Sequence, residues 1–253
     1  MSKVTFYMDQ VKYDIKKFVF KDEQKEPHEI HFACPIEEFE SQINEIFFEE
    51  HYAKGKVKKN MVIMDIGANV GSVCIYFRDW AKKIYAIEPE ATNFECLTRN
   101  TNDLSNVYRF NCAILSYDGV LTLYGTEDSP PQSLFNGDIK EEVPCFKMDT
   151  FFTKEGIKKI DLLKIDAEGA EYYIFASDAF AKVADKIDNI IGEAHFITGV
   201  NPNMIYPILE QYGYKVEFLP FENMNRTCSL EDLTTHRIAK FKTMEQTMFF
   251  AHR

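Results

Sequence analysis

The stretch MVIMDIGANVG, which runs from Met61 to Gly71, decides the fold that we predict for this chain. It opens with an apolar run short enough for a buried strand, and Gly67 and Gly71 break the pattern that follows. Apolar residues then recur at three- and four-residue steps, as on the buried face of a helix: Val70, Val73, Cys74, Phe77 and Ala81. A strand, a glycine turn and a helix form the first half of a βαβ unit. Ligands of open α/β sheets collect just beyond the carboxyl end of such a strand.

The glycine turn itself has the features of a ligand site. Gly67 lets the backbone turn tightly and approach a ligand, and Gly71 is predicted to let the helix pack onto its strand. The N–H groups of the helix start, near Ala68 and Asn69, can bind a carboxylate or a phosphate. Asp65 could accept a hydrogen bond from a ligand amino group or cap the N–H groups of the turn. A generic Rossmann-like turn capped by Asp65 remains an alternative, because a short glycine motif is a weak signal alone.

An acid follows at the distance expected for a ribose contact. The segment 83–87 is predicted to be a second strand that ends at Glu88, which lies 88 − 67 = 21 residues after Gly67. In this architecture an acid about twenty residues after the turn meets the ribose hydroxyls. A nicotinamide dinucleotide would need G-x-G-x-x-G, but Asn69 and Ser72 replace its second and third glycines. We therefore predict an adenosine-bearing ligand, with a nucleotide- or nicotinamide-binding α/β enzyme as the alternative.

A third predicted strand, Val107 to Ala113, ends beside the glycine turn. In a doubly wound sheet this is where an adenine ring is held by a side-chain amide and by backbone groups. Asn111, Cys112 and Ala113 are the candidates for that role. On residue type alone, Asn111 is equally well explained as a turn former.

A second chemical cluster follows the predicted strand from Ile160 to Asp166. If this strand is the neighbour of the first, Asp166 and Glu168 face the same crevice as Gly67. With Glu171, these residues make three acids at one strand exit. Their mutual repulsion is usually tolerated only where a cation, a substrate hydroxyl or a proton transfer needs them. Alternatively, Glu171 could simply stabilise a helix amino terminus.

The next predicted strand, 188–194, brings an acid and an imidazole to the same edge. His195 is our candidate general base, because an unperturbed imidazole titrates near neutrality, and Glu193 is predicted to orient it. The alternative is an ordinary strand-end histidine bonded to backbone. Asp166, Glu168 and His195 could also hold a divalent metal, but their spacing is not diagnostic, and we predict no metal.

Composition limits the remaining possibilities. The 253 residues, 45% of them hydrophobic, suit one α/β domain with additions. A net charge of -11 and a pI near 5.1 argue against nucleic acid or an anionic membrane as the main partner. The chain shows no signal-peptide core and no apolar run that could cross a bilayer, so a cytoplasmic location is expected. The six scattered cysteines predict buried free thiols.

Segments outside the motifs are predicted to form additions. Residues 1–60 precede the domain at 61–253 and read as an α+β extension, with strands at 4–8, 13–20 and 28–33 and then an amphipathic helix. We interpret this layer as a cover for the sheet edge rather than a substrate or dimer surface. Residues 119–124 are predicted to be an exposed strand and 143–147 a short one, with an irregular stretch at 126–142 between them that could be a lid, in which Ser133 and Leu134 stand out. A polar insertion is expected at 221–245, before an antiparallel last strand, 246–252.

Together the motifs resemble those of the FkbM-type methyltransferase family. They are D-I-G-A-N-V-G from Asp65, E-P from Glu88, V-P-C-F-K-M-D from Val143, L-K-I-D-A-E-G-A-E from Leu163 and E-A-H from Glu193. The similarity covers roughly residues 62–214. Gln132-Ser133-Leu134 departs from the family's frequent pair of serines before a leucine.

The resemblance implies a class I, Rossmann-like fold: a doubly wound, mostly parallel, seven-stranded sheet with an antiparallel last strand. It also implies S-adenosylmethionine as cofactor, bound by the first two motifs, and transfer mostly to oxygen, on a small-molecule or glycan acceptor. Asp166 and Glu168 would then hold acceptor hydroxyls or the methionine amino group. A non-catalytic S-adenosylmethionine-binding module and a homodimer remain possible.

Overall fold

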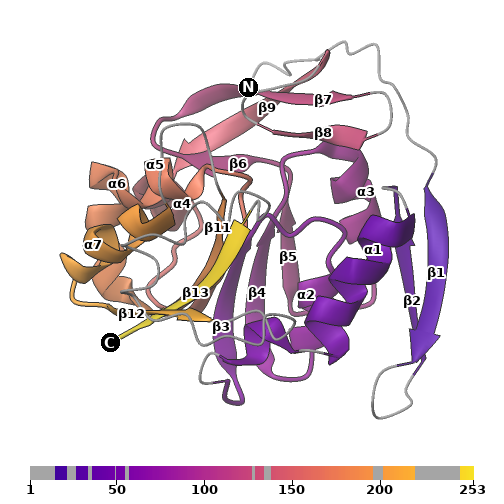
Figure 1. The fold of residues 1–253 in the computed structure, drawn as a ribbon, viewed down its shortest axis with the longest axis horizontal. Coiled ribbons are helices and arrows are strands. Elements are labelled where there is room, and N and C mark those ends of the chain that lie inside the picture. Colours follow the sequence, from indigo (N-terminus) through magenta and orange to yellow (C-terminus); the bar gives the residue numbers. More distant parts are fainter. Residues whose placement is uncertain are drawn as a thin grey trace, which may run out of the picture.

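The large sheet has the predicted doubly wound architecture. A computed structural model describes residues 15–21, 27–33, 36–48, 50–54, 57–126, 129–133, 138–195, 202–219 and 246–253. Its main sheet has seven strands in the order β12-β13-β11-β10-β3-β4-β5 (Figure 1). The strands are β3 (Met61–Ile66), β4 (Ala81–Ile87), β5 (Val107–Phe110), β10 (Ile160–Ile165), β11 (Ile187–His195), β12 (Lys215–Leu219) and β13 (Gln246–His252).

The predicted pairing of the first motif strand with the acidic strand is confirmed. β3 lies between β4 and β10, parallel to both, and Ile165 is the register partner of Ile66. β13 runs antiparallel to β11 and β12, as predicted for the last strand. The chain winds outward from β3 in one direction and from β10 in the other. The crevice at the carboxyl ends of β3 and β10 is therefore the topological switch point, where such sheets bind ligands.

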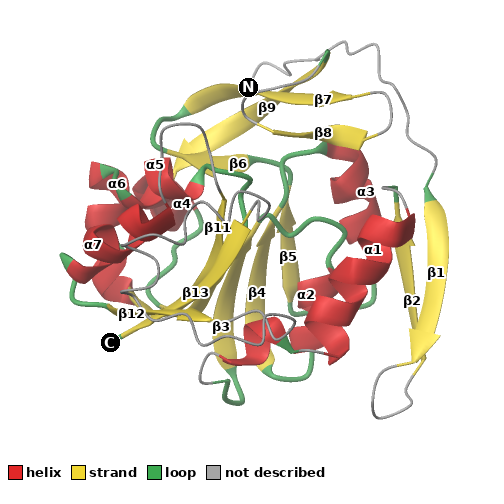
Figure 2. Cartoon of the chain, in the orientation of Figure 1, coloured by secondary structure: helices red, strands yellow, loops and turns green. Residues whose placement is uncertain are grey.

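Helices cover both faces of this sheet (Figure 2). α4 (Met148–Lys154), α5 (Glu171–Phe175), α6 (Asp178–Ala181) and α7 (Ile205–Glu210) contribute to one apolar cluster. α2 (Ser72–Phe77) and α3 (Ala91–Asn100) contribute to the other. Successive strand residues alternate between the clusters, so Met64 packs in the first and Ile63 in the second. Strands buried on both faces explain why their sequences are almost continuously apolar.

The amino-terminal layer packs on α2 and α3, and its role as a cover for the sheet edge stays a prediction. It consists of the antiparallel pair β1 (Lys16–Lys21) and β2 (Pro27–Phe32), α1 (Ile36–Ile43), a π-helical turn at 44–48 and a 3-10 turn at 51–54. The Asn100 amide of α3 donates to the His31 carbonyl at 2.9 Å. The buried apolar residues of this layer belong to the same cluster as α2 and α3: Ile30, Phe32, Phe39, Ile43, Ile46, Phe47 and Tyr52.

The strands predicted at 119–124 and 143–147 are confirmed, but the stretch between them is not simply irregular, because much of it joins these strands in a second sheet. β6 (Ala113–Leu115), β7 (Gly119–Thr126), β8 (Ser129–Ser133) and β9 (Ile139–Lys147) pair in the order β6-β9-β7-β8. The single strand predicted for 107–113 is divided between β5 and β6. Pro130 and Pro131 lie in β8, an edge strand, where a missing N–H breaks no inner ladder. Ser133 ends β8, whereas Leu134 lies outside the described residues.

Several smaller predictions can also be compared with the structure. The first motif helix ends at Phe77, and Ala81 begins β4 instead of extending the helix. Four cysteines are free and buried as predicted: Cys74, Cys96, Cys112 and Cys145. The strand expected at 4–8 and the insertion expected at 221–245 lie outside the described residues. Among the helices that the structure describes, none has both the length and the apolar character that a bilayer crossing requires.

Candidate active site

The glycine turn after β3 is packed against the end of β10. Gly67 has φ +74°, and a Cβ there would lie 1.7 Å from the Asp166 carbonyl oxygen. Its N–H and that of Ala68 both donate to the Ile87 carbonyl at 3.0 Å. Glycine is therefore required at this position by close backbone approach as well as by its conformation. The turn joins the ends of three parallel strands, β10, β3 and β4.

The second glycine has a different role from the one predicted. Gly71 precedes α2 with φ +88°, and a Cβ there would lie 2.7 Å from Leu97 Cδ1 and 3.2 Å from Thr101 Cγ2. Both neighbours belong to α3 and its carboxyl end, not to a strand. Gly71 thus allows α2 to start close against α3, and it does not line the pocket described below.

Glu88 connects the glycine turn to the end of β4. One carboxylate oxygen accepts from the Asn69 N–H at 2.8 Å and the other from the Glu90 N–H at 2.9 Å. Burial raises the pKa of Glu88 to about 8, although these N–H groups favour the charged form. Each carboxylate oxygen retains a second lone pair, and Glu88 lines the pocket. The predicted ribose contact is compatible with this position.

The three residues proposed for adenine binding separate in the structure. Asn111 is exposed, and its amide donates to the carbonyls of Glu88 and Pro89 at 3.1 and 2.8 Å. Its side-chain amide therefore stabilises the end of β4, as in the turn-former alternative. Cys112 and Ala113 do line the pocket.

A pocket opens where the two sheets meet. About 670 Å³ of empty space, part of it open to solvent, lies between its lining residues. Gly67, Asn69 and Glu88 line one side, and Leu121 and Leu123 of β7 line another. The rest of the lining is mostly apolar: Ile66, Ile87, Pro89, Asn93, Cys112, Ala113, Ile114, Leu115, Asp166, Ala167, Glu168 and Ala170.

Asp65 acts on the turn through a lysine. It is fully buried and absent from the pocket lining, and its Oδ1 lies 3.3 Å from the Lys164 Nζ. Lys164 donates to the Gly67 carbonyl at 2.7 Å and lies 3.6 Å from Asp166 Oδ2. Burial opposes the charge on Lys164, but Asp65 and Asp166 raise its pKa above the ordinary value. Among the described residues, Asp65 accepts no hydrogen bond from the N–H groups of the turn, and its predicted contact with a ligand amino group stays a prediction. The overlooked signal was a lysine between Leu163 and Ile165 in the buried part of β10.

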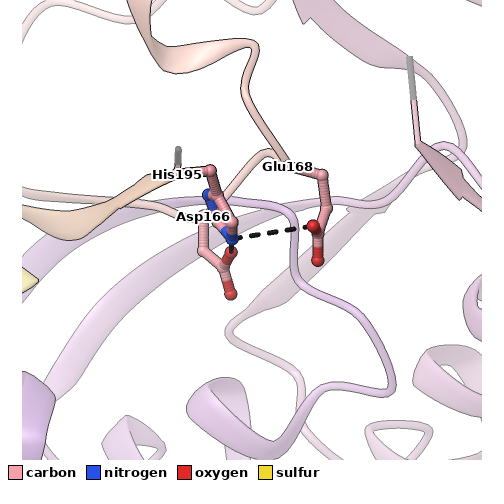
Figure 3. A group of neighbouring side chains, drawn as sticks. All are labelled: Asp166, Glu168 and His195. Atoms are coloured by element: carbon pink, nitrogen blue, oxygen red, sulfur yellow. Dashed lines mark ion pairs between the residues drawn. The ribbon is translucent and has the colours of Figure 1, made fainter. Parts of the chain in front are cut away.

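Asp166, Glu168 and His195 converge at the carboxyl ends of β10 and β11 (Figure 3). The His195 Nε2 lies 3.7 Å from Asp166 Oδ1 and 3.6 Å from Glu168 Oε2. His195 is buried, whereas the Glu168 side chain is 49% exposed. Asp166 and Glu168 line the pocket beside Gly67, so the predicted shared crevice is observed.

Glu171, and not Glu193, holds the His195 ring. Glu171 is fully buried at the start of α5, and its Oε1 lies 3.0 Å from His195 Nδ1. The same oxygen accepts from the Ala167 N–H at 2.8 Å. The sequence grouped Glu171 with Asp166 and Glu168 or assigned it to a helix terminus, and it indicated no contact with His195. The Tyr172 hydroxyl donates to the His195 carbonyl at 2.7 Å, so both ring and backbone are held by the start of α5.

These carboxylates change the titration of His195. Burial disfavours the imidazolium, but Glu171, Asp166 and Glu168 outweigh it and raise the pKa to about 10. With those acids ionised, the ring carries a proton at neutral pH. The predicted general-base role stays a prediction, and it requires another positive charge to compensate the acids.

Glu193 belongs to a separate contact with the amino-terminal layer. It accepts a hydrogen bond from the Tyr52 hydroxyl at 2.8 Å, and both residues are buried. The Tyr52 ring centroid also lies 5.5 Å from the Lys164 Nζ. Burial and the Asp166 charge raise the pKa of Glu193. Tyr52 was not identified from the sequence, because nothing in its lysine-rich surroundings indicates a contact 141 residues away.

The fold and the pocket together define a class of protein. A switch-point pocket with a glycine turn, an acid at the next strand end and an apolar wall fits a ligand that carries a nucleoside and an amino acid. This is the arrangement of class I methyltransferases, which use S-adenosylmethionine. The sheet order confirms the expected fold class, and the family match given next supports the expected cofactor.

The chain belongs to the FkbM methyltransferase family, because the model of the methyltransferase FkbM domain matches residues 65–216. Methyltransferase sdnD of Sordaria araneosa is 27% identical over 221 residues, which cover 72% of this chain and 85% of that protein. A methyltransferase FkbM from Methylobacillus flagellatus is 14% identical, with a TM-score of 0.48, over 76% of this chain and 44% of that one. Aeropyrum pernix fibrillarin with bound S-adenosyl-L-methionine is 11% identical, with a TM-score of 0.49, over 93% and 82% of the two chains.

Proposed function

We propose that this methyltransferase transfers the methyl group to a hydroxyl oxygen of a small molecule or glycan. The supporting observation is the position of Asp166 and Glu168, whose side chains line the cofactor pocket and lie beside His195. A hydroxyl donor fits this edge because carboxylate oxygens are strong acceptors for O–H groups. Glu168 is half exposed, so an acceptor can reach it from solvent.

The protein's main task in this reaction is alignment. Bound S-adenosylmethionine supplies a methyl group that its sulfonium already activates. The acceptor oxygen forms the new bond to that methyl carbon as the bond from sulfur breaks, and the sulfur keeps the electron pair. Holding two reactants in line can supply about 7–11 kcal/mol of barrier reduction. The rigid turn at Gly67 and the apolar wall at Leu121 and Leu123 would hold the cofactor for this purpose.

The acceptor proton must leave the oxygen as the new bond forms. Asp166 and Glu168 would accept the hydroxyl's hydrogen bond, and the proton would pass to this cluster and then to solvent through the exposed side of Glu168. His195 remains the candidate base once its surrounding acids are compensated. Glu171 is its positioning residue, because it holds Nδ1 and so directs Nε2 toward the two carboxylates.

The cofactor contacts are part of the same proposal. Glu88 would accept from the ribose hydroxyls, the backbone at Cys112 and Ala113 would hold the adenine, and Asp166 would meet the methionine amino group. The negative net charge of -11 supports an acceptor other than nucleic acid. A homodimer and a domain boundary near residue 60 stay predictions.

Product analysis with a matched acceptor pair tests the proposal. Protein, isotopically labelled methyl donor and a glycan or metabolite extract are incubated, and labelled products are identified by mass spectrometry. The purified acceptor and its analogue with the reacting hydroxyl replaced by hydrogen are then compared. We expect labelled methyl ether from the first and none from the second. Transfer to nitrogen or carbon would contradict the proposal.

A His195→Ala variant separates chemistry from cofactor binding. We expect it to retain adenosylhomocysteine binding in calorimetry and to lose about 100-fold or more in turnover, the usual range for a removed acid–base group. Unchanged turnover would remove His195 from the mechanism. Cofactor binding without turnover on any acceptor would favour a non-catalytic module.

A further inference from the structure

We propose that Asp166, Glu168 and His195 bind a divalent cation at the edge of the cofactor pocket. One oxygen from each acid and one histidine nitrogen lie within 4.8 Å of one another (Figure 3). The two carboxylates come from the segment that follows β10, and the imidazole comes from the end of β11. The sequence alone predicted no metal here, since the spacing of the three residues along the chain resembles no known ligand motif.

The observed distances suit an octahedral cation after a small movement of side chains. Donor atoms at about 2.1 Å from such an ion are about 3.0 Å apart when adjacent. Nε2 of His195 lies 3.6 and 3.7 Å from the two carboxylate oxygens, so each of these two pairs must approach by about 0.6–0.7 Å to reach that spacing. Two carboxylates and one imidazole form a mixed oxygen and nitrogen set, which suits Mn²⁺ and leaves coordination positions for water or an acceptor oxygen.

The support behind His195 is an independent indication of a ligand. Metal-binding histidines usually donate their second ring N–H to a carboxylate, which fixes the tautomer and the ring direction. The fully buried Glu171 provides that partner at 3.0 Å from Nδ1. The Tyr172 hydroxyl also holds the His195 backbone at 2.7 Å. The ring is thus fixed with Nε2 toward Asp166 and Glu168, as a metal ligand requires.

The charge and access of the site also suit a cation. Asp166 and Glu168 place two carboxylates beside one imidazole, and Glu171 lies against the other nitrogen of the same ring. A divalent ion would add positive charge among these acids. Glu168 is 49% exposed, so an ion can enter from solvent.

The catalytic consequence of the cation rests on the proposed function, whereas its binding does not. An acceptor oxygen coordinated to the ion would lose its proton more easily, because the positive charge stabilises the alkoxide. His195 would then be a metal ligand, and its role as a general base would pass to a carboxylate or to solvent.

Binding of Mn²⁺ is the direct test. The full chain is freed of metal with a chelator and titrated with Mn²⁺, with and without adenosylhomocysteine, and free Mn²⁺ is followed by electron paramagnetic resonance. We expect one saturable site per chain. Glu168→Gln and His195→Ala should each weaken binding at least about tenfold. Glu171→Gln keeps all three ligands and should weaken binding about 10- to 100-fold, as supporting partners of metal ligands do.

Asp79→Asn is the matched control, because Asp79 is an acid with a 79% exposed side chain in the turn before β4. It should leave Mn²⁺ affinity unchanged. A folded protein that binds neither Mn²⁺, Mg²⁺ nor Zn²⁺ would overturn the proposal, and so would Mn²⁺ binding that Glu168→Gln leaves intact. Circular dichroism spectra confirm that each variant is folded. Mn²⁺ binding with no transfer to hydroxyls would support the site and contradict only the proposed function.

Discussion

The two halves of the pocket are built in different ways. At the ends of β3 and β4, a contiguous turn and a single acid are held by backbone groups: Gly67 donates to Ile87, and Glu88 accepts from Asn69 and Glu90. At the ends of β10 and β11, side chains from separate segments of the chain contact one another. Glu171, for example, holds the His195 ring. The cofactor half is therefore a local backbone structure, whereas the acidic half is a long-range network.

This difference fits the roles that we propose for the two halves. The backbone turn would hold the cofactor, and the network of ionisable side chains would set the charge and proton affinity that meet the acceptor. Lys164 connects the halves, because it contacts Asp65, the Gly67 carbonyl and Asp166.

The largest effect is expected where the two halves meet. Lys164→Met removes a buried positive charge and leaves Asp65 uncompensated, which should lower the free energy of unfolding by about 3–5 kcal/mol. Urea denaturation measures this change. The double variant Lys164→Met/Asp65→Asn should recover a substantial part of the loss. If the loss of the double variant equals the sum of the losses of the two single variants, the residues do not interact.

The glycine turn offers a test with a matched pair. Gly67→Ala places a methyl group against the Asp166 carbonyl, so it should cost about 1–3 kcal/mol more stability than Gly156→Ala. Gly156 also has a positive φ, +64°, but a Cβ there meets nothing within 4 Å. Thermal and urea unfolding measure both. Equal costs would mean that the close approach of β10 to the turn does not constrain residue 67.

The amino-terminal contact tests how far the acidic network extends. Tyr52→Phe leaves the buried Glu193 without its 2.8 Å hydrogen bond, which should lower the free energy of unfolding by about 1–3 kcal/mol. Tyr108→Phe is the control, since that ring is 47% exposed. The same urea titrations measure both variants. If both variants change the free energy of unfolding by the same amount, the first sixty residues do not support the site through Tyr52.

The smallest effect concerns the protonation of Glu88. Its pKa rises from 4.5 to about 8 on folding, so the folded state binds the proton more tightly than the unfolded state does. This contribution to stability is complete below about pH 4.5 and is lost as the pH rises to about 8.

Glu88→Gln removes that titration. Between pH 5 and pH 8 the free energy of unfolding should therefore fall less in the variant than in the wild type, and the two falls should differ by roughly 1.4 kcal/mol or more. Urea unfolding across this pH range measures the difference. Glu95→Gln, a change at an exposed acid on α3, should keep the wild-type slope. A parallel profile for Glu88→Gln would show that Glu88 is already ionised in the folded protein.

The sequence by itself determined the sheet, its switch point, and the glycine turn and acid of the cofactor half of the pocket. Those features depend on short segments: apolar strands buried on both faces, Gly67 at a strand end, and Glu88 at the end of the next strand. Backbone geometry over a few residues is sufficient to place them. The sequence also predicted that Asp166, Glu168 and His195 share an edge, because parallel strands end together.

Only the tertiary structure decided which partner each side chain takes. Glu171 and Glu193 are both acids near His195, and only the start of α5 brings Glu171 to its ring. The Tyr52 contact and the second sheet behind Leu121 depend likewise on how distant segments pack. Residue type and spacing do not predict such contacts, because a hydrogen bond forms with whichever group the folded chain places within about 3 Å.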